Sequence, residues 1–119
     1  MKPRKISPMR SRKSPTPDLL ALIADQFRAL AEPARLAILH AIGPEERTVT
    51  ELVSATALGQ GNLSKHLQHL LAAGFVVRRR HGLYVYYALA DTDVLSLCDI
   101  MCSRLESEAK QRHRIVTAG

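Results

Sequence analysis

Hydrophobic residues recur at helical spacing over most of the chain. Between residues 18 and 42 they return every three or four positions, which predicts two helices, with Pro33 in the first turn of the second. Asp18 is the expected cap of the first helix, and Gly43-Pro44 the expected end of the second. The residues expected on the apolar face of the first helix are Leu19, Leu20, Leu22, Ile23, Phe27 and Leu30, and the core candidates of the second helix are Leu36, Ile38, Leu39 and Ile42.

The pattern continues through a short strand and two further helices. The segment "RTVT" favours a strand, and Thr50 is the expected cap of a helix over "ELVSATAL". Gly59 interrupts the period before "QGNLSKHLQHLLAAG", whose leucines again recur at helical spacing. Gly74 is the expected left-handed residue that ends this helix.

After Gly74 the period changes from helical to alternating. The segments "FVVRRR" and "LYVYYAL", joined by "HG", are typical of a β-hairpin, and a long helix is expected from about Asp91 to Arg112. The predicted fold is therefore mainly α with a small β-hairpin. Two short helices joined by a glycine-containing turn and followed by a basic hairpin predict a winged helix-turn-helix.

The two ends of the chain differ from its middle. Residues 1–17 contain four prolines and six basic residues but no acid, so we expect a disordered basic arm that either solubilises the protein or contacts DNA. Residues 18–112 are the predicted winged helix-turn-helix DNA-binding domain, and residues 113–119 a flexible tail. The 119 residues together have the length of about one domain.

The net charge of +6 is carried by the N-terminal arm, because basic and acidic residues balance in the rest of the chain. Within that balanced part, residues 57–90 contain four basic residues and no acid. One basic face on a neutral domain indicates a localised nucleic-acid surface. No apolar run is long enough to cross a membrane and no signal core follows the N-terminus, so we expect a cytoplasmic protein without membrane contact.

Polar residues at the start of "GQGNLSKHLQHL" are free to contact DNA if the leucines face the core. Asparagine and glutamine can pair with adenine, serine and lysine can hold phosphates, and Gly61 allows close backbone approach. The basic hairpin tip suits phosphates or a minor groove. The alternative is that both pieces are solvated surface. The expected DNA contacts are Gln60, Gly61, Asn62, Ser64, Lys65, His66, Arg78, Arg79, Arg80, His81 and Tyr84.

The segments "FRALAEPARLAILHAI" and "TVTELVSATALGQGNLSKHLQHLLAAGFVVRRRHGLYVYYAL" resemble the ArsR/SmtB family of bacterial repressors. The resemblance covers residues 18–110 and is most specific in "LSKHLQHLLAAGFV" followed by "RRRHGLYVYY". It implies a homodimer joined by the first and last helices, which binds an imperfect inverted repeat in an operator. It also implies release by an inducer, commonly a metal or metalloid ion.

The sensing residues of that family are largely replaced in this chain. Val53 and Ala55 stand where its arsenite sensors carry a Cys-x-Cys, and the second helix lacks the cysteine of its persulfide sensors. The positions that match the metal ligands of the family's zinc sensors hold, in chain order, Asp91, Asp93, Arg104 and Ser107. Arg104 therefore puts a cation where those sensors carry a ligand.

Cys98 and Cys102 are the two cysteines of the chain and lie one helical turn apart. Residues at this spacing share a helix face, so we expect both thiols to face a partner helix or the core. One interpretation makes them ligands of a soft ion such as arsenite, zinc or cadmium, or targets of thiol modification. The other makes them two small apolar side chains in a packed seam.

An enzyme is the main rival class. The chain has no glycine-rich phosphate loop after a strand, and no Cys-x-x-Cys beside a βαβ pattern. The sequence therefore predicts a transcriptional repressor, released through Cys98 and Cys102. The alternatives are a regulator of the same family with structural cysteines, or a winged-helix module that binds protein.

Overall fold

The computed structural model describes residues 14–118. They form helices packed around a small antiparallel sheet, in the order predicted from the sequence, which confirms the winged helix-turn-helix prediction. Of the arm expected over residues 1–17, residues 1–13 lie outside the described residues. In chain order the elements are α1 (Pro17–Leu30), α2 (Pro33–Ile42), β1 (Arg47–Thr48), α3 (Val49–Thr56), α4 (Gln60–Ala73), β2 (Val76–His81), β3 (Tyr84–Leu89) and α5 (Asp93–Ala118).

The hydrophobic core lies where α2, α3 and α4 meet one face of the sheet. Leu63, Leu67 and Leu70 are fully buried and recur on the same face of α4, which turns that face inward. Burial of each leucine stabilises the fold by about 1.5–3 kcal/mol. The other buried apolar residues are Ile38, Leu39, Ile42, Leu52, Val76, Tyr87 and Val94.

The sheet has the strand order β1-β3-β2, with both neighbouring pairs antiparallel. The prediction placed the hairpin turn at "HG". It lies one residue later, at Gly82 and Leu83, because His81 pairs with Tyr84. Gly82 has a φ of +63°, which glycine adopts without steric cost.

The hairpin presents its arginines on two different faces. Side chains of directly paired residues point to the same face, and the face alternates along each strand. Arg78 pairs with the buried Tyr87, so Arg78 and its second neighbour Arg80 share the core side of the hairpin. Arg79 pairs with Tyr86 on the opposite face.

An ion pair ties the outer face of the hairpin to the loop after α2. Arg79 donates two hydrogen bonds to Glu46, from Nε to Oε2 and from Nη2 to Oε1, each 2.7 Å long. The Arg79 guanidinium also lies 5.1 Å from the centre of the Tyr86 ring, within cation–π range. These hydrogen bonds are the main reason why the pKa of Glu46 lies below its ordinary value, and the charges of Arg79 and His81 lower it further.

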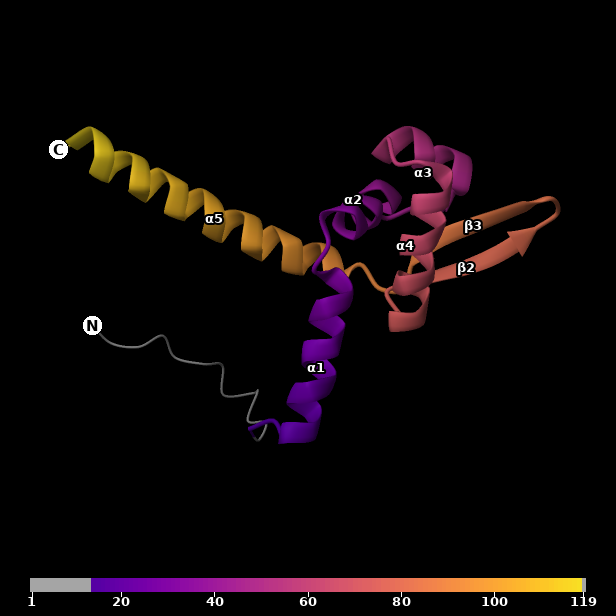
Figure 1. Cartoon of the computed structure of the whole chain (residues 1–119), viewed down its shortest axis with the longest axis horizontal. Coiled ribbons are helices and arrows are strands. Elements are labelled where there is room, and N and C mark those ends of the chain that lie inside the picture. Colours follow the sequence, from indigo (N-terminus) through magenta and orange to yellow (C-terminus); the bar gives the residue numbers. More distant parts are fainter. Residues whose placement is uncertain (1–13, 119) are drawn as a thin grey trace.

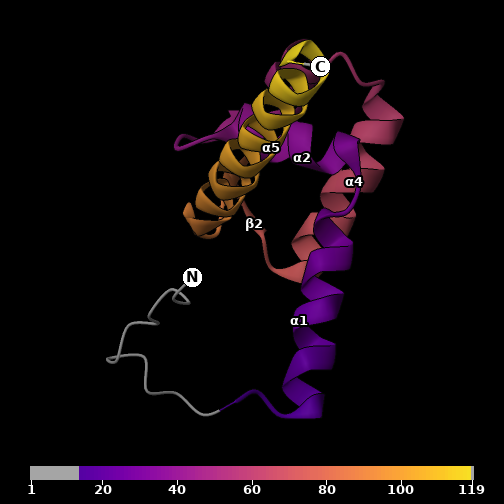
Figure 2. The same cartoon turned by 90° about the vertical axis from the view of Figure 1, so that its left-hand side faces the viewer.

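Two long elements extend from the core in opposite directions (Figure 1), the hairpin on one side and α5 on the other. The turned view shows that the N-terminal end of α1 also stands clear of the other helices (Figure 2). Residues 113–118 were expected in a flexible tail, but α5 continues through them to Ala118. No helix among the described residues has the length and hydrophobicity needed to cross a membrane.

Two helix starts differ from the sequence prediction. Thr16 caps α1, in place of Asp18, by accepting a hydrogen bond from the backbone N–H of Leu19 (3.1 Å). Thr48 caps α3, in place of Thr50, and forms a reciprocal capping box with Glu51. In both cases a side chain earlier in the sequence reaches the free N–H groups of the first turn, so the helix begins closer to the N-terminus than predicted.

The capping box predicts a difference between two neighbouring threonines. Thr48→Ala removes the acceptor for the Glu51 N–H and is expected to lower the free energy of unfolding by about 1 kcal/mol. Thr50→Ala, at an exposed helical position, is the matched control and should change it by less than about 0.5 kcal/mol. Urea unfolding at one fixed protein concentration measures both. Equal losses in the two variants would contradict the observed cap.

The Glu46–Arg79 pair predicts a pH dependence. Because the pKa of Glu46 is lowered in the folded chain, its stabilising contribution is present at neutral pH and is lost as the pH falls through that lowered pKa. Carbon-detected NMR titration should find the Glu46 carboxyl titrating below an ordinary glutamate. Arg79→Ala should return the midpoint to the ordinary range of a glutamate. A midpoint that is unchanged in Arg79→Ala would mean that the pair does not form in solution.

Candidate nucleic-acid interface

The turn between α3 and α4 is held by local bonds. The Thr56 hydroxyl donates to the Leu52 carbonyl (2.7 Å) and accepts from the Leu58 N–H (3.3 Å). Ala57 is left-handed with a φ of +60°, and Gly59 is the N-cap of α4. This turn sets the direction in which α4 leaves α3, as a helix-turn-helix requires.

The first turns of α4 expose most of the residues predicted to contact DNA. Leu63 and Leu67 point into the core, so the remaining positions face solvent. A Cβ built on Gly61 would meet no atom within 4 Å, so the fold itself does not require glycine there. The exposed residues of this set, called the α4 polar face below, are Gln60, Gly61, Asn62, Ser64 and Lys65.

His66, predicted to belong to the same set, has a different environment. It is half-buried, and its Nδ1 lies 3.4 Å from Nη1 of Arg35 at the start of α2. Its ring therefore already has a partner within the chain.

The hairpin supplies the basic part of the surface. Arg78 and Arg80 line a hollow of about 330 Å³ together with Val85, and no ion pair is found for either arginine within residues 14–118. Arg79 differs from them because Glu46 engages it on the opposite face. His81 and Tyr84 are exposed next to the hairpin turn.

Charge is segregated along the molecule. Residues 57–90, which include α4 and the hairpin, carry no acidic side chain. The acids after residue 90 lie on α5 and the loop before it, and α5 extends in the direction opposite to the hairpin (Figure 1). Lys65 on the α4 polar face and Arg78 and Arg80 on the hairpin therefore carry positive charge in a segment without acids, which suits contact with a polyanion.

The two cysteines lie on α5 as predicted, but they differ in exposure. Cys98 is half-buried and Cys102 is exposed, and both thiols are free. Within the single chain Cys102 does not face the core, because α5 covers little of the core beyond Val94 and Leu95, and the alternative that the thiols face a partner helix stays a prediction. Within the described residues no group of three or more histidine, cysteine and acidic side chains is placed to hold a metal ion.

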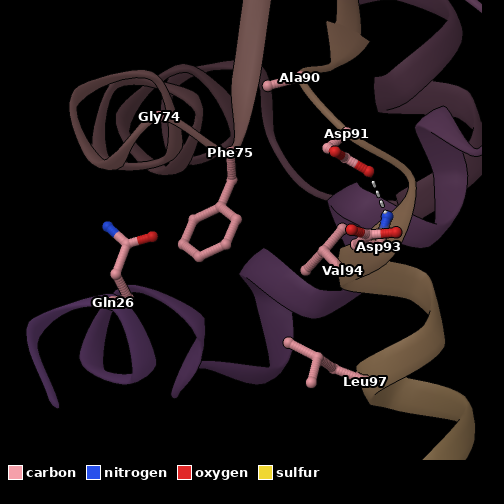
Figure 3. A pocket seen from close by; sticks show the side chains of 8 residues that line it. All are labelled: Gln26, Gly74, Phe75, Ala90, Asp91, Asp93, Val94 and Leu97. Atoms are coloured by element: carbon pink, nitrogen blue, oxygen red, sulfur yellow. Dashed lines mark hydrogen bonds between the residues drawn. The ribbon is translucent and has the colours of Figure 1, made fainter. Parts of the chain in front are cut away.

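A pocket of about 260 Å³ lies between α1, the end of α4 and the start of α5 (Figure 3). Asp91 and Asp93 stand at its edge, at two positions where zinc sensors carry ligands. Asp91 accepts a hydrogen bond (2.8 Å) from the N–H of Asp93, the first residue of α5. Arg104, at a third such position, is paired with Glu108 at 3.7 Å. These residues do not fit a zinc site of that kind.

Large apolar side chains remain exposed on α1 and α5. No residue of α1 is buried, although the helix has a strongly apolar face. Contiguous exposed apolar surface of this kind marks a site of association. The exposed residues are Leu19, Leu20, Leu22, Ile23 and Phe27 on α1, and Leu97, Ile100, Met101, Leu105, Ile115 and Val116 on α5.

Sequence reasoning missed two residues that organise this surface, Arg35 and Glu46. Each makes its bond to a residue more than thirty positions away, so neither partner is visible from local spacing. The available signal was weak: a single arginine within "EPARLAIL", and an acid just before a short strand.

Comparison with known proteins agrees with this geometry. A helix-turn-helix domain model matches residues 30–79. The chain is 34% identical over 99 residues to the probable mercury resistance operon repressor of Streptomyces lividans. The match covers 72% of this chain and 79% of that protein. The chain is 42% identical over 77 residues to the transcriptional repressor SmtB of Mycobacterium tuberculosis, covering 65% of this chain and 57% of that protein.

A solved structure extends the likeness to the whole fold. It is the homodimeric winged helix-turn-helix DNA-binding domain Mb0332 of Mycobacterium bovis, described as a possible ArsR-family regulator. The TM-score is 0.70 at 30% identity, and the match covers 85% of this chain and 94% of that one. The chain therefore belongs to the ArsR/SmtB family of helix-turn-helix transcriptional repressors, which are regulators and not enzymes.

Proposed function

We propose that this protein is a homodimeric repressor that binds an inverted-repeat operator and is released when an inducer acts at Cys98 and Cys102. The observation that carries the DNA-binding part is the α4 polar face lying in one acid-free segment with the hairpin arginines. In a winged helix, the second helix of the helix-turn-helix enters the major groove and the hairpin contacts the flanking backbone.

Most of the predicted residues have a role in that arrangement, the exceptions being His66 and Arg79, which are engaged by Arg35 and Glu46. Gln60 and Asn62 read base edges, whereas Ser64 and Lys65 hold phosphates or bases. Gly61 lets the α4 backbone approach the duplex closely, because no side chain stands between them. Arg78 and Arg80 contact phosphates next to the groove, with His81 and Tyr84 at the hairpin tip.

The exposed apolar faces of α1 and α5 support the homodimer. Both faces belong to helices that extend beyond the core, so neither is covered within the chain. A second copy of the chain would cover them. The related Mycobacterium bovis domain is homodimeric. A two-fold dimer presents two α4 helices to the two halves of an inverted repeat.

The operator test uses fluorescence anisotropy with a duplex from immediately upstream of the protein's own gene and a scrambled duplex of equal length. The wild type should prefer the upstream duplex. Arg80→Ala should weaken binding to both duplexes and reduce the slope of log K against log salt by about 1.8, because each subunit of the dimer loses one phosphate contact. Gly61→Ala should weaken binding without loss of folding stability, since alanine is a better helix former by up to about 1 kcal/mol.

Gln111→Ala, an exposed change on α5 away from the hairpin, is the matched control and should bind like the wild type. Wild-type binding by both Gly61→Ala and Arg80→Ala would exclude this placement of the duplex. Equal affinity of the wild type for both duplexes would exclude an operator upstream of its own gene.

Cys98 and Cys102 are the proposed inducer site. They lie at i and i+4 on one helix face, and thiolates prefer soft ions such as arsenite, cadmium, zinc or mercuric ion. The related Streptomyces repressor carries mercury resistance in its name. In the proposed dimer, α5 lies at the contact between subunits, so two pairs of thiols can supply the ligands that one chain lacks. An ion or a thiol modification there changes the spacing of the two recognition helices.

Arsenite titrated into the reduced protein–DNA complex should lower the anisotropy of the wild type. Parallel titrations use mercuric, cadmium and zinc ions. Cys98→Ser/Cys102→Ser protein should bind the duplex with unchanged affinity and should stay bound at every ion concentration. If the wild type and the double variant respond alike to every ion, the two cysteines are packing residues and the inducer acts elsewhere.

A further inference from the structure

One arginine connects the end of α1 to the recognition helix α4. Arg35 is half-buried in the first turn of α2, and its guanidinium has three neighbours. Its Nε donates to the Ala29 carbonyl (2.7 Å), and its Nη2 donates to the Arg28 carbonyl (3.3 Å). Its Nη1 lies 3.4 Å from Nδ1 of His66.

The bond to the Ala29 carbonyl satisfies a group that the helix leaves open, whereas the Arg28 carbonyl also accepts from the Ala31 N–H (3.2 Å). The last carbonyls of a helix have no partner within it, and a cation at this end interacts favourably with the helix dipole. The planar guanidinium carries five N–H donors in fixed directions, so it can bind these carbonyls and a third acceptor at the same time. Arg35 thus holds the C-terminal end of α1 in a set position beside α2.

The bond to His66 restricts the histidine ring. A guanidinium donates hydrogen bonds and cannot accept them, so a hydrogen bond across this contact uses Nδ1 of His66 as the acceptor. Nδ1 is therefore committed to Arg35. Half of the hydrogen-bonding capacity of the ring is used inside the chain, unlike the exposed side chains of the α4 polar face.

The helices α1 and α4 are joined at two points. Near the C-terminal end of α4, Gln26 Nε2 donates to the Ala73 carbonyl (3.0 Å). At the middle of α4, the Arg35–His66 contact reaches the final turn of α1 through the bonds of Arg35 to that turn. One contact alone would leave α4 free to tilt about it, whereas two contacts at separate points along α4 restrict the angle between the helices.

We propose that Arg35 and His66 form a positioning pair that sets the spacing of half-sites accepted by the dimer. This rests on the proposed function, in which α1 joins the subunits and α4 enters the groove. The two recognition helices of a dimer must meet half-sites about 34 Å apart, so a tilt at the DNA-facing end of α4 changes which spacing fits. The pair assigns His66 to positioning and removes it from the residues that read bases.

The test compares two variants that change the position of the acceptor at residue 66 and one that changes the donor. In His66→Asn the amide oxygen occupies the place of Nδ1, so Arg35 keeps its hydrogen-bond partner. In His66→Gln the amide lies farther along, at the place of Nε2, so Arg35 loses its hydrogen-bond partner. Arg35→Lys removes the planar fork and leaves one compact charge. Circular dichroism and thermal melting check that each full-length variant folds.

Each protein is titrated with duplexes cut from the wild-type footprint. One duplex holds a single half-site, and the others hold both half-sites at the natural spacing or with one base pair added or removed. We expect His66→Gln and Arg35→Lys to bind the single half-site like the wild type. They should bind the natural two-site duplex about 10-fold more weakly, within the usual range of coupling between sites, and discriminate less between spacings. His66→Asn should retain the wild-type spacing preference.

Two results would overturn the proposal. Equal loss on the single half-site and on the two-site duplex would make His66 a direct DNA contact. An unchanged spacing preference in both His66→Gln and Arg35→Lys would show that the pair does not set the angle of α4. If the wild type itself binds no duplex above the scrambled control, the proposed function fails, and that result is separate from both.

Discussion

Burial of the leucine stripe of α4 is the interaction on which the rest of the structure depends. Leu63, Leu67 and Leu70 occupy one helix face and fill the core between α2, α3 and the sheet. Because the side chains on one face of a helix determine which face is left outside, their burial turns the α4 polar face toward solvent. The same packing places β2 beside α4, since Gly74 ends the helix and Val76 already belongs to the core. Core formation and exposure of the proposed DNA-binding surface are thus one event.

The two ends of the fold have the opposite property, because their apolar residues lack partners within the chain. The core of a single chain does not cover the apolar faces of α1 and α5, and the proposed second copy would cover them. Cys98 and Cys102 lie on one of these helices. In the proposed dimer, an event at the thiols would therefore act on the element that relates the subunits and alter the distance between the recognition helices without contact with DNA.

Polar bonds over long sequence distances adjust this arrangement. Glu46 holds Arg79 on the outer face of the hairpin, which separates it from Arg78 and Arg80. Arg35 joins the end of α1 to His66 on α4. Neither bond forms the fold, since the leucine core does that, but each determines the direction of a side chain or helix that the proposed function uses.

The sequence by itself determined the order of the elements, the core face of α4 and the family, because hydrophobic period and helix-ending glycines act over short distances. It placed the helix caps at Asp18 and Thr50, where local spacing cannot tell which of two nearby side chains reaches the free N–H groups. Only the tertiary structure decided that Arg79 pairs with Glu46, that His66 meets Arg35, and that Cys102 is exposed. Strand register and contacts between residues about thirty positions apart come from packing of the whole chain, which no local pattern contains.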